Sequence, residues 1–243
     1  MSKFFIPREN VFSDKLIING EDVKHITKVL RYGVGDEIIC CDGMGNDYTA
    51  RIISCEKEIE CEITKKSKAQ TESNIHVTII QGVPKAAKMD YIIQKTTELG
   101  VCEIYPCEMS RCVAKIENNK KLDRWQKISR EAAKQSGRGI IPTIHSPVNI
   151  SGAIEILKTA DVAFAAYECE DGHYLKPLLK ASESPKSVAF IIGPEGGFDK
   201  AEIEELIKNG IPTISLGKRI LRTETAGEAI LAMVMYEIGD ING

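Results

Sequence analysis

The sequence predicts an α/β protein that begins with a small β-rich domain. Over the last two thirds of the 243 residues, short apolar runs alternate with helical patterns, which is typical of a mostly parallel sheet. The first 70 residues instead contain short strand patterns separated by turn residues. We therefore expect a β-barrel-like domain over residues 1–70 and an α/β domain over residues 71–243.

The elements of the N-terminal domain are predicted mainly from apolar patterns. Three short strands are expected, at residues 15–18, 36–40 and 58–63. The last of them alternates charged and apolar side chains, as a strand with one buried face does. A short helix is expected over residues 21–30, where Val23, Ile26 and Leu30 share one side. The polar stretch 65–74 has no periodicity and is predicted to be a linker.

The elements of the C-terminal domain are predicted from apolar runs and from residues that begin or end helices. Four buried strands are expected, at residues 75–80, 162–166, 188–192 and 213–216. Four helices are expected, at residues 84–99, 120–136, 199–210 and 225–236. Pro84 suits a helix start, and Gly100 suits a helix end. Asp199, with Glu202 three residues later, predicts a capping box at the third helix.

Charge is distributed unevenly along the chain. The formal net charge is −3, but residues 81–141 contain 12 basic against 7 acidic side chains, and residues 142–243 contain 9 against 15. A basic middle section in an acidic protein favours a local anionic partner. A solvated helix face explains the same charge equally well, so charge alone leaves both interpretations open.

The residue pattern predicts no membrane association and no metal site. No apolar run is long enough to cross a bilayer, and charge and Pro7 interrupt the N-terminus before a signal-peptide core can form. A cytoplasmic location is therefore expected. None of the eight cysteines forms a Cys-x-x-Cys pair, and no histidine has zinc-finger spacing. We expect reduced, packed thiols and no bound metal.

The first of two loops with candidate binding residues covers residues 191–199. It follows a predicted strand, opens a predicted helix and contains three glycines, which allow a ligand to approach the backbone closely. Ligands of open α/β sheets bind at the carboxyl ends of strands. Pro194 and Glu195 exclude the Gly-x-Gly-x-x-Gly dinucleotide pattern, and the loop lacks the Gly-Lys-Ser/Thr of a phosphate-binding P-loop. A tight turn without a ligand remains the alternative.

The second loop covers residues 216–226 and also connects a predicted strand to a predicted helix. It contains three cations and two threonines. Thr223 or Thr225 is expected to cap the last helix, and Glu228 would complete a capping box with Thr225. Capping does not explain Ile220 and Leu221, because apolar side chains in a loop indicate a pocket or a ligand.

These two loops resemble the two cofactor loops of the 16S ribosomal RNA (uracil-N3)-methyltransferase family, which belongs to the SPOUT superfamily. Further segments are similar to the same family, in the same order along nearly the whole chain. They are residues 25–31, Lys85 with Asp90, residues 94–100 and residues 131–138. The resemblance implies a SPOUT-type α/β sheet with a C-terminal deep trefoil knot, preceded by a PUA-like RNA-binding β-barrel. It therefore implies a methyltransferase domain over residues 71–243.

The resemblance also implies the reaction and its participants. The methyl group of S-adenosyl-L-methionine would be transferred to N3 of a uridine in 16S rRNA, within the 30S subunit. Such proteins form homodimers, and the apolar segment 229–236 is expected to be buried in a core or at an interface. The implied cofactor-binding residues lie in the two loops and the following helix. They are Ile192, Gly193, Glu195, Gly196, Leu216, Gly217, Ile220, Leu221, Thr225 and Ala226.

Three residues are candidates for the chemistry. Uracil N3 carries a proton at neutral pH, so the enzyme must remove this proton or stabilise the N3 anion. Arg222 is the candidate for stabilising the developing charge or for binding phosphate. Glu195 or Glu224 is the candidate general base, although Glu195 also suits a role in positioning the cofactor. A water-mediated or purely electrostatic route stays open.

Two groups of basic residues are candidates for RNA contacts. In the N-terminal domain they are Arg8, His25, Lys28 and Arg31. On and near the expected helix 120–136 they are Arg111, Lys115, Arg124, Lys127, Arg130, Lys134 and Arg138. On that helix, an apolar face is expected to pack against the protein; it consists of Leu122, Trp125, Ile128 and Ala132.

Two other functions compete with this one. Another SPOUT RNA methyltransferase, such as a ribose 2′-O-methyltransferase, would share the fold and the cofactor. A non-catalytic RNA-binding or ribosome assembly factor would keep the fold without the activity. Intact cofactor loops at residues 191–199 and 216–226 favour an enzyme over the second alternative.

Overall fold

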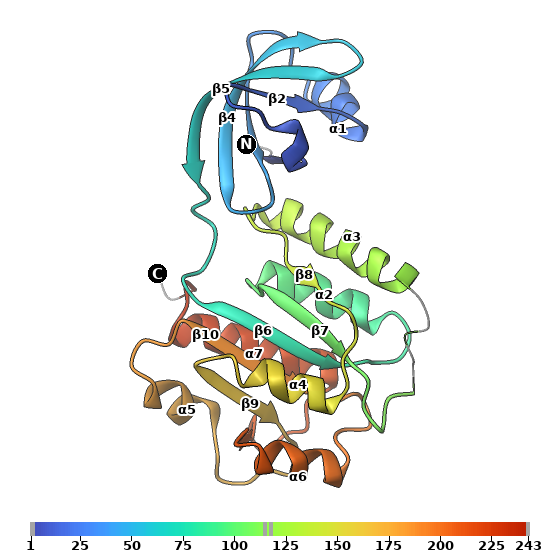
Figure 1. The fold of residues 1–243 in the computed structure, drawn as a ribbon, viewed down its shortest axis with the longest axis vertical. Coiled ribbons are helices and arrows are strands. Elements are labelled where there is room, and N and C mark those ends of the chain that lie inside the picture. Colours follow the sequence, from blue (N-terminus) through green and yellow to red (C-terminus); the bar gives the residue numbers. More distant parts are fainter. Residues whose placement is uncertain (1–2, 114–115, 117–118, 242–243) are drawn as a thin grey trace. The chain divides into compact units, whose positions relative to one another are not determined.

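The computed structural model describes residues 3–113, 116 and 119–241, and the chain forms two compact units (Figure 1). One unit consists of Met1–Glu72 and Ala133–Ile141, and the other of Ser73–Ala132 and Pro142–Gly243. The boundary expected after residue 70 lies close to this division. The difference is that residues 133–141 group with the first unit, although the residues on both sides of them in the sequence belong to the second unit.

The first unit is built around one sheet. Within its described part, five strands lie in the order β1-β3-β4-β5-β2, and all neighbours are antiparallel except β1 and β3. Their bounds are Lys3–Phe5, Lys15–Ile18, Glu37–Cys41, Asn46–Cys55 and Ile59–Lys68 for β1 to β5. The three expected strands are confirmed as β2, β3 and β5, and β1 and β4 are additional. Alternate residues of these strands, including Leu16, Ile38 and Ile52, form the buried core.

The helical segments of this unit are short. A 3-10 turn covers Arg8–Asn10, and α1 covers Glu21–Lys24. The chain continues from α1 into a π-helical turn at His25–Val29. The expected helix over residues 21–30 is thus confirmed as helical, but its second half is more widely wound than an α-helix.

The linker expected over residues 65–74 is wrong in its first part. β5 continues to Lys68, and residues 65–68 pair with residues 46–49 of β4. The side chains of residues 65–68 are exposed, so main-chain hydrogen bonds to β4 hold this segment rather than burial of an apolar face. A strand end of this kind lacks the alternation that makes strands recognisable in a sequence.

The second unit contains a parallel sheet. In the part that the structure describes, six strands lie in the order β11-β9-β10-β6-β7-β8, and every neighbouring pair is parallel. Their bounds are His76–Gly82, Glu103–Cys107, Thr143–Ile144, Val162–Ala166, Ser187–Ile192 and Thr213–Ile214 for β6 to β11. The four expected strands are confirmed, while β7 and β8 are additional. Their buried apolar runs fit a sheet that is covered on both faces.

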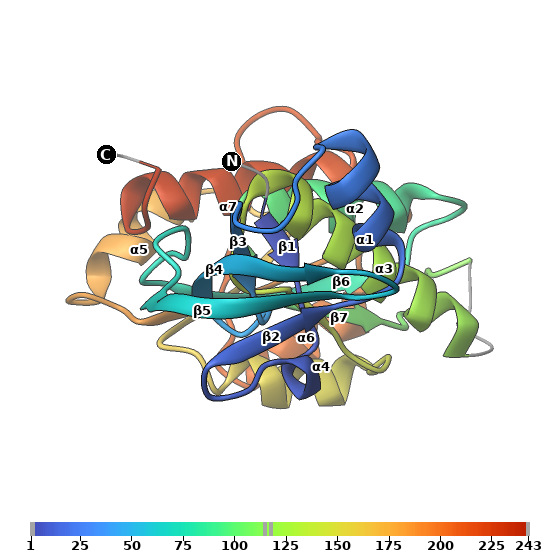
Figure 2. The same cartoon turned by 90° about the horizontal axis from the view of Figure 1, so that it is seen from above.

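Helices cover both faces of this parallel sheet. Their bounds are Lys88–Glu98, Asn119–Ser136, Ile150–Leu157, Leu175–Ala181, Lys200–Lys208 and Thr223–Glu237 for α2 to α7. Figure 2 shows α2 and α7 on one face and α4 and α6 on the other. The expected α3 is confirmed, and Trp125 and Ala132 on its apolar face are buried. The capping box of α6 is also confirmed, since Asp199 and Glu202 make both of its hydrogen bonds.

The expected start of α2 at Pro84 is wrong. Ala86 has a φ of 52°, in the left-handed region, and the helix begins only at Lys88. A left-handed residue interrupts the right-handed helical path, so the turn after β6 separates Pro84 from the helix. The expected end is confirmed, because Gly100 follows the helix with a φ of 100°.

The threonine caps expected for the last helix are also wrong. α7 begins at Thr223, its N-cap residue is Arg222, and no side chain caps it. Thr223 is buried, and its hydroxyl donates a hydrogen bond to the backbone carbonyl of Gly193. A tertiary hydrogen bond therefore replaces the local capping bond that the sequence suggests for either Thr223 or Thr225.

All eight cysteines are free thiols. Cys40, Cys41, Cys61 and Cys107 are buried, whereas Cys169 is exposed, against the expectation of packed thiols. Burial raises the pKa of Cys41, Cys61 and Cys107 to about 12. Among the described residues, no helix could cross a membrane, and no cluster of three or more side chains could hold a metal ion.

Candidate active site

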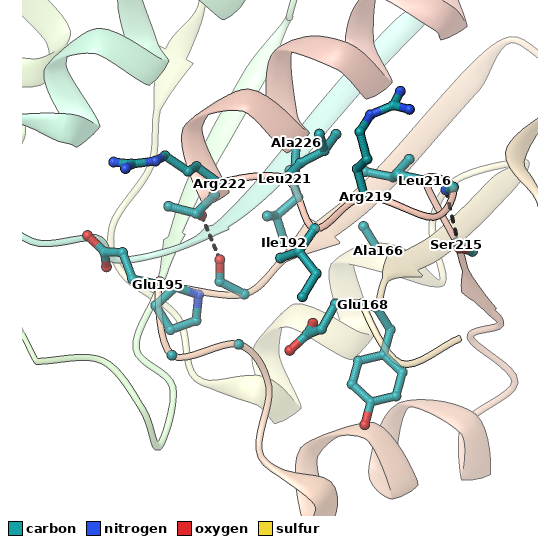
Figure 3. Close-up of a pocket in the computed structure, with 18 of the residues that line it drawn as sticks. Ala166, Glu168, Ile192, Glu195, Ser215, Leu216, Arg219, Leu221, Arg222 and Ala226 are labelled. Atoms are coloured by element: carbon teal, nitrogen blue, oxygen red, sulfur yellow. Dashed lines mark hydrogen bonds between the residues drawn. The ribbon is translucent and has the colours of Figure 1, made fainter. Parts of the chain in front are cut away.

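A cavity of about 510 Å³ lies at the carboxyl ends of β9, β10 and β11 in the second unit (Figure 3). These strands are neighbours in the sheet, in the order β11-β9-β10, so the segments that follow them meet at one edge. The lining residues come from residues 166–168, 192–197 and 215–223, together with Lys88 and Ala226. Both loops singled out in the sequence therefore contribute to one cavity.

Glycines bring the backbone segments of this cavity close together. A Cβ atom on Gly193 would lie 3.0 Å from the carbonyl carbon of Gly197, and one on Gly82 would lie 2.6 Å from Cδ of Pro194. Gly197 has a φ of 67°, and a Cβ there would lie 2.2 Å from Oε1 of Glu168. Only glycine fits these positions without a shift of the surrounding atoms, so the loop after β10 requires its glycines for close packing.

The structure places nearly all of the expected cofactor-binding residues at the cavity. The lining set includes Ile192, Gly193, Glu195, Gly196, Leu216, Gly217, Ile220, Leu221 and Ala226. Thr225 does not line it and is exposed in the first turn of α7. Ile220 is 84% exposed and therefore forms an edge of the cavity, whereas the partly buried Leu221 packs against the core.

Sequence reasoning missed two parts of the lining. Ala166 is the last residue of β9, and Tyr167 and Glu168 follow it. The expected strand at residues 162–166 is a signal that could have indicated them. Lys88 comes from the first turn of α2, far from both loops in the sequence. No local pattern indicates Lys88, since only the tertiary fold brings it to the cavity. Arg222, the candidate for stabilising charge, also lines the cavity. The other lining residues lie in the two loops or directly beside them; they are Pro194, Gly197, Ser215, Lys218, Arg219 and Thr223.

Lys88 joins the two glutamates that are candidate bases. Its Nζ lies 3.0 Å from Oε1 of Glu195 and 3.4 Å from Oε2 of Glu224. The backbone N–H of Lys85 also donates to the Glu195 carboxylate, at 3.1 and 3.3 Å from its two oxygens. Glu195, Lys88 and Glu224 thus form a charged bridge between the loop after β10, α2 and α7.

The protonation of Glu195 follows from these contacts. Partial burial acts to raise the pKa of its carboxyl group. Hydrogen bonds from its own backbone N–H, from the Lys88 ammonium and from the Lys85 N–H outweigh that effect and hold the pKa below its ordinary value. The hydrogen bond with Glu195 is the largest cause of a raised pKa at Lys88, and the contact with Glu224 acts in the same direction. Glu195 is therefore charged at neutral pH and is a weak proton acceptor.

Arg222 occupies the N-cap position of α7 and is exposed. In Figure 3 its side chain extends to the same side of the cavity as Glu195, while Arg219 extends in another direction. Among the described residues, Arg222 forms no ion pair. Its guanidinium is thus available to an anionic ligand at the cavity edge.

A buried chain of hydrogen bonds connects β6 to both cavity loops. Nε2 of Gln81 donates to the carbonyl of Gly82 at 3.0 Å and to Oγ1 of Thr223 at 2.8 Å. The Thr223 hydroxyl in turn donates to the carbonyl of Gly193 at 2.7 Å. We call Gln81, Thr223 and Gly193 the buried relay.

The candidate RNA contacts in the second unit differ in whether their side chains are paired within the protein. Arg111 donates to the carbonyl of Gly196 at 3.0 Å and pairs with Asp199 at 3.5 Å, so it packs on the loop after β10. Arg124 forms an ion pair with Asp90. Arg130 and Lys127 are exposed on α3, and Lys115 lies outside the described residues.

The candidate RNA contacts in the first unit divide in the same way. Exposed side chains belong to Arg8, His25, Lys28 and Arg31, and Arg31 has a φ of 59°. Lys134 is half-buried and pairs with Asp22 at 2.7 Å. Arg138 is only 4% exposed and pairs with Glu72 at 2.7 Å, so its side chain has a structural role inside this unit. In this structure Arg138 is not accessible to a phosphate.

Comparisons with known proteins agree along the whole chain. The family model described as an RNA methyltransferase domain matches residues 71–235, and the one described as an RNA methyltransferase PUA domain matches residues 18–64. The ribosomal RNA small subunit methyltransferase E of Bacillus subtilis (strain 168) is 36% identical over 234 residues, which cover 93% of this chain and 91% of that protein.

Solved structures show the same likeness. The ribosomal RNA small subunit methyltransferase E of Neisseria gonorrhoeae, bound to S-adenosyl methionine, matches with a TM-score of 0.84 and 31% identity over 99% of both chains. A Legionella pneumophila protein in complex with the bound cofactor SAM matches with a TM-score of 0.83 and 30% identity over 98% of both chains. The fold, the two matched domains and the level of identity together show that the chain belongs to the ribosomal RNA small subunit methyltransferase E family, with a PUA domain followed by a SPOUT-type methyltransferase domain.

Proposed function

We propose that this chain transfers a methyl group from S-adenosyl-L-methionine to N3 of a uridine in 16S rRNA. The observation that carries the proposal is the cavity at the ends of β9, β10 and β11, which contains the two loops that resemble the family's cofactor loops. Membership of the ribosomal RNA small subunit methyltransferase E family supports the reaction and the rRNA substrate. The choice of uridine N3 rests on the resemblance of the loop sequences.

The cavity fits S-adenosyl-L-methionine in size and chemistry. Its volume of about 510 Å³ is in the usual range for small-molecule sites. Ala166, Ile192 and Leu221 offer apolar contacts to an adenine ring. Glu168 supplies a negative charge, and Lys218 and Arg219 supply positive ones, which suits a ligand that carries both cationic and anionic groups. When bound, the cofactor supplies a methyl group on a positively charged sulfur.

The residues of this chain would act on the uracil. N3 must lose its proton as its bond to the methyl group forms, and the negative charge that develops on the ring needs a cation nearby. Arg222 is exposed at the cavity edge and would stabilise that charge. Glu195 would position Lys88 and the loop, because its lowered pKa makes it a weak base. Glu224, or a water molecule, would then accept the proton.

The exposed basic residues would bind the rRNA backbone. In the first unit these are Arg8, His25, Lys28 and Arg31, and in the second unit Arg124 and Arg130 on α3 would contribute. Contacts to phosphates position RNA without reading its sequence, and their strength falls with salt. Replacing Arg31 by Glu should therefore weaken binding to 16S rRNA at low salt and reduce the salt dependence of binding.

The outer face of α7 is where we propose that two copies meet. Met233 and Tyr236 are 42% and 63% exposed on an otherwise apolar helix, which favours a homodimer. The trefoil knot implied by the SPOUT resemblance would involve the two loops after β10 and β11. Action on the 30S subunit would place the reaction in the cytoplasm.

A methyl-transfer assay on 30S subunits that lack the modification tests the proposed reaction. Tritiated S-adenosyl-L-methionine is the methyl donor, and nucleoside mass spectrometry locates the methyl group. The proposal expects 3-methyluridine in 16S rRNA. A 2′-O-methylated nucleoside would favour the ribose methyltransferase alternative. If no methyl group is transferred to the RNA, a non-catalytic factor is favoured. Naked 16S rRNA in a parallel reaction shows whether the assembled subunit is required.

A further inference from the structure

The buried relay joins three segments that are distant in the sequence. Gln81 lies near the end of β6, Gly193 begins the loop after β10, and Thr223 begins α7. Gln81 is fully buried and Thr223 is 6% exposed. Because water does not reach these groups, their hydrogen bonds can be made only inside the protein.

The direction of each hydrogen bond in the relay is fixed. A backbone carbonyl can only accept, so the end of the Gln81 carboxamide that contacts the Gly82 carbonyl must be its nitrogen. The same nitrogen contacts Thr223 and therefore donates to its hydroxyl as well. The Thr223 hydroxyl accepts that bond through its oxygen and donates its single proton to the backbone carbonyl of Gly193. Valine has the shape of threonine but would satisfy neither Gln81 nor Gly193.

The relay also sets the spacing between the two cavity loops. Gly193 and Thr223 both line the cavity, and Thr223 stands between Arg222 and Glu224 in the sequence. The close approach of Gly82 to Pro194 supports the same arrangement from the β6 side. Apolar packing alone permits small sliding motions between such segments, whereas directed hydrogen bonds of buried groups specify one arrangement.

We propose that Gln81 and Thr223 are positioning residues, which hold the two loops in the arrangement that binds S-adenosyl-L-methionine. This inference rests on the proposed cofactor. A site that is already in its binding arrangement loses less entropy on binding, so loosening the loops lowers affinity even where no direct ligand contact is removed. Gln81 does not line the cavity, so its substitution removes no residue that would touch the cofactor.

Calorimetric titration with S-adenosyl-L-methionine tests the inference. Thr223→Val should weaken cofactor binding by about tenfold, because two buried hydrogen bonds are lost. Thr223→Ser keeps the hydroxyl and should bind within about twofold of the wild type. Thr96→Val is the matched control, because Thr96 is also fully buried but donates its hydroxyl to the Ile92 carbonyl within α2. It should lower the unfolding free energy without changing cofactor affinity.

A double-mutant cycle separates the relay from a general loss of stability. Gln81→Met removes the amide donor and should also weaken binding, and it serves as the second variant if Thr223→Val does not fold. The combined variant should bind little more weakly than Thr223→Val alone, because both substitutions break the same chain of bonds. Additive losses, or binding by Thr223→Val within twofold of wild type, would overturn the inference. A wild-type protein that binds no S-adenosyl-L-methionine would instead overturn the proposed function, and the inference with it.

Discussion

Lys88 places its Nζ atom 3.0 Å from Oε1 of Glu195, so the first residue of α2 is ion-paired with the loop that follows β10. The same nitrogen lies 3.4 Å from Oε2 of Glu224, in the first turn of α7. Two carboxylates that are both candidates for the chemistry therefore share one cation. This arrangement separates their roles, because Glu195 accepts additional hydrogen bonds from backbone N–H groups and Glu224 has no such donors among its described contacts.

Replacing Lys88 by Met should lower kcat for methyl transfer by roughly ten- to hundredfold, since misplaced catalytic groups typically cost this much. Without the ammonium, Glu195 and Glu224 repel each other, and the pKa of Glu195 rises. The acid limb of the profile of kcat against pH should therefore move to higher pH. Lys88→Arg preserves the charge and should keep most of the activity. A Lys88→Met enzyme with wild-type kcat and an unchanged pH profile would contradict the shared-cation arrangement.

Replacing Arg222 by Ala should lower kcat with little effect on the affinity for S-adenosyl-L-methionine. Removing one donor to a developing negative charge typically costs about a hundredfold in rate. Arg219→Ala is a suitable comparison, because this neighbouring arginine also lines the cavity but extends in another direction (Figure 3). Single-turnover rates and calorimetric affinities would be measured for both. Full turnover by Arg222→Ala would exclude the catalytic role.

The lowered pKa of Glu195 predicts how stability depends on pH. A carboxyl group with a folded-state pKa below its ordinary value of 4.5 contributes stability above that value, and the contribution is lost as pH falls through the folded-state pKa. Glu195→Gln should thus be less stable than the wild type at pH 7, and the difference should shrink below about pH 4.5. Urea unfolding at pH 7 and in acid would measure this. An equal difference at both pH values would show that the charge of Glu195 contributes nothing.

Ala86 offers a test of backbone strain beside the cavity. Its φ of 52° is unfavourable for any residue with a Cβ atom. Ala86→Gly should raise the free energy of unfolding by about 0.5–1 kcal/mol, as relief of this strain exceeds the entropy that glycine adds to the unfolded chain. Ala87 is the matched control, because its φ is −85°, and Ala87→Gly should lower stability by a similar amount. Destabilisation by both substitutions would show that position 86 is not strained.

Arg138 should prove structural rather than RNA-binding. Its guanidinium is buried and paired with Glu72, and breaking a buried pair by removing one partner costs about 3 kcal/mol. Arg138→Met should therefore lower the midpoint of urea unfolding strongly. The salt dependence of RNA binding should stay the same for the protein that remains folded, in contrast to Arg31→Glu. A normal unfolding curve with a reduced salt slope would reverse this assignment.

Elements with a strong local pattern could be predicted from the sequence. β9 and β10 are continuous apolar runs, and the Asp199–Glu202 box fixes the start of α6, so both kinds of signal appear in the structure as expected. The two cavity loops were also recognisable, because glycines and cations directly follow such strands. These features depend on residues that are close in the sequence.

The incorrect predictions depend on contacts between distant residues. Thr223 looks like a helix cap, but Gln81 and Gly193 compete for its hydroxyl, and a buried hydrogen bond outweighs a capping bond that water can replace. In the sequence, Arg138 suggests a basic surface, but in the structure it is ion-paired with Glu72. Lys88 has no local signal at all. Tertiary partners, which a single sequence does not reveal, decide each of these cases.

The uneven burial of the cysteines gives the protein a natural attachment point for a probe. Cys41, Cys61 and Cys107 are buried, and their raised pKa keeps them as unreactive thiols. Cys169 is exposed and directly follows Glu168, which lines the cavity. A maleimide fluorophore should therefore react first at Cys169. Its emission would report the arrival of a ligand in real time without any engineered residue.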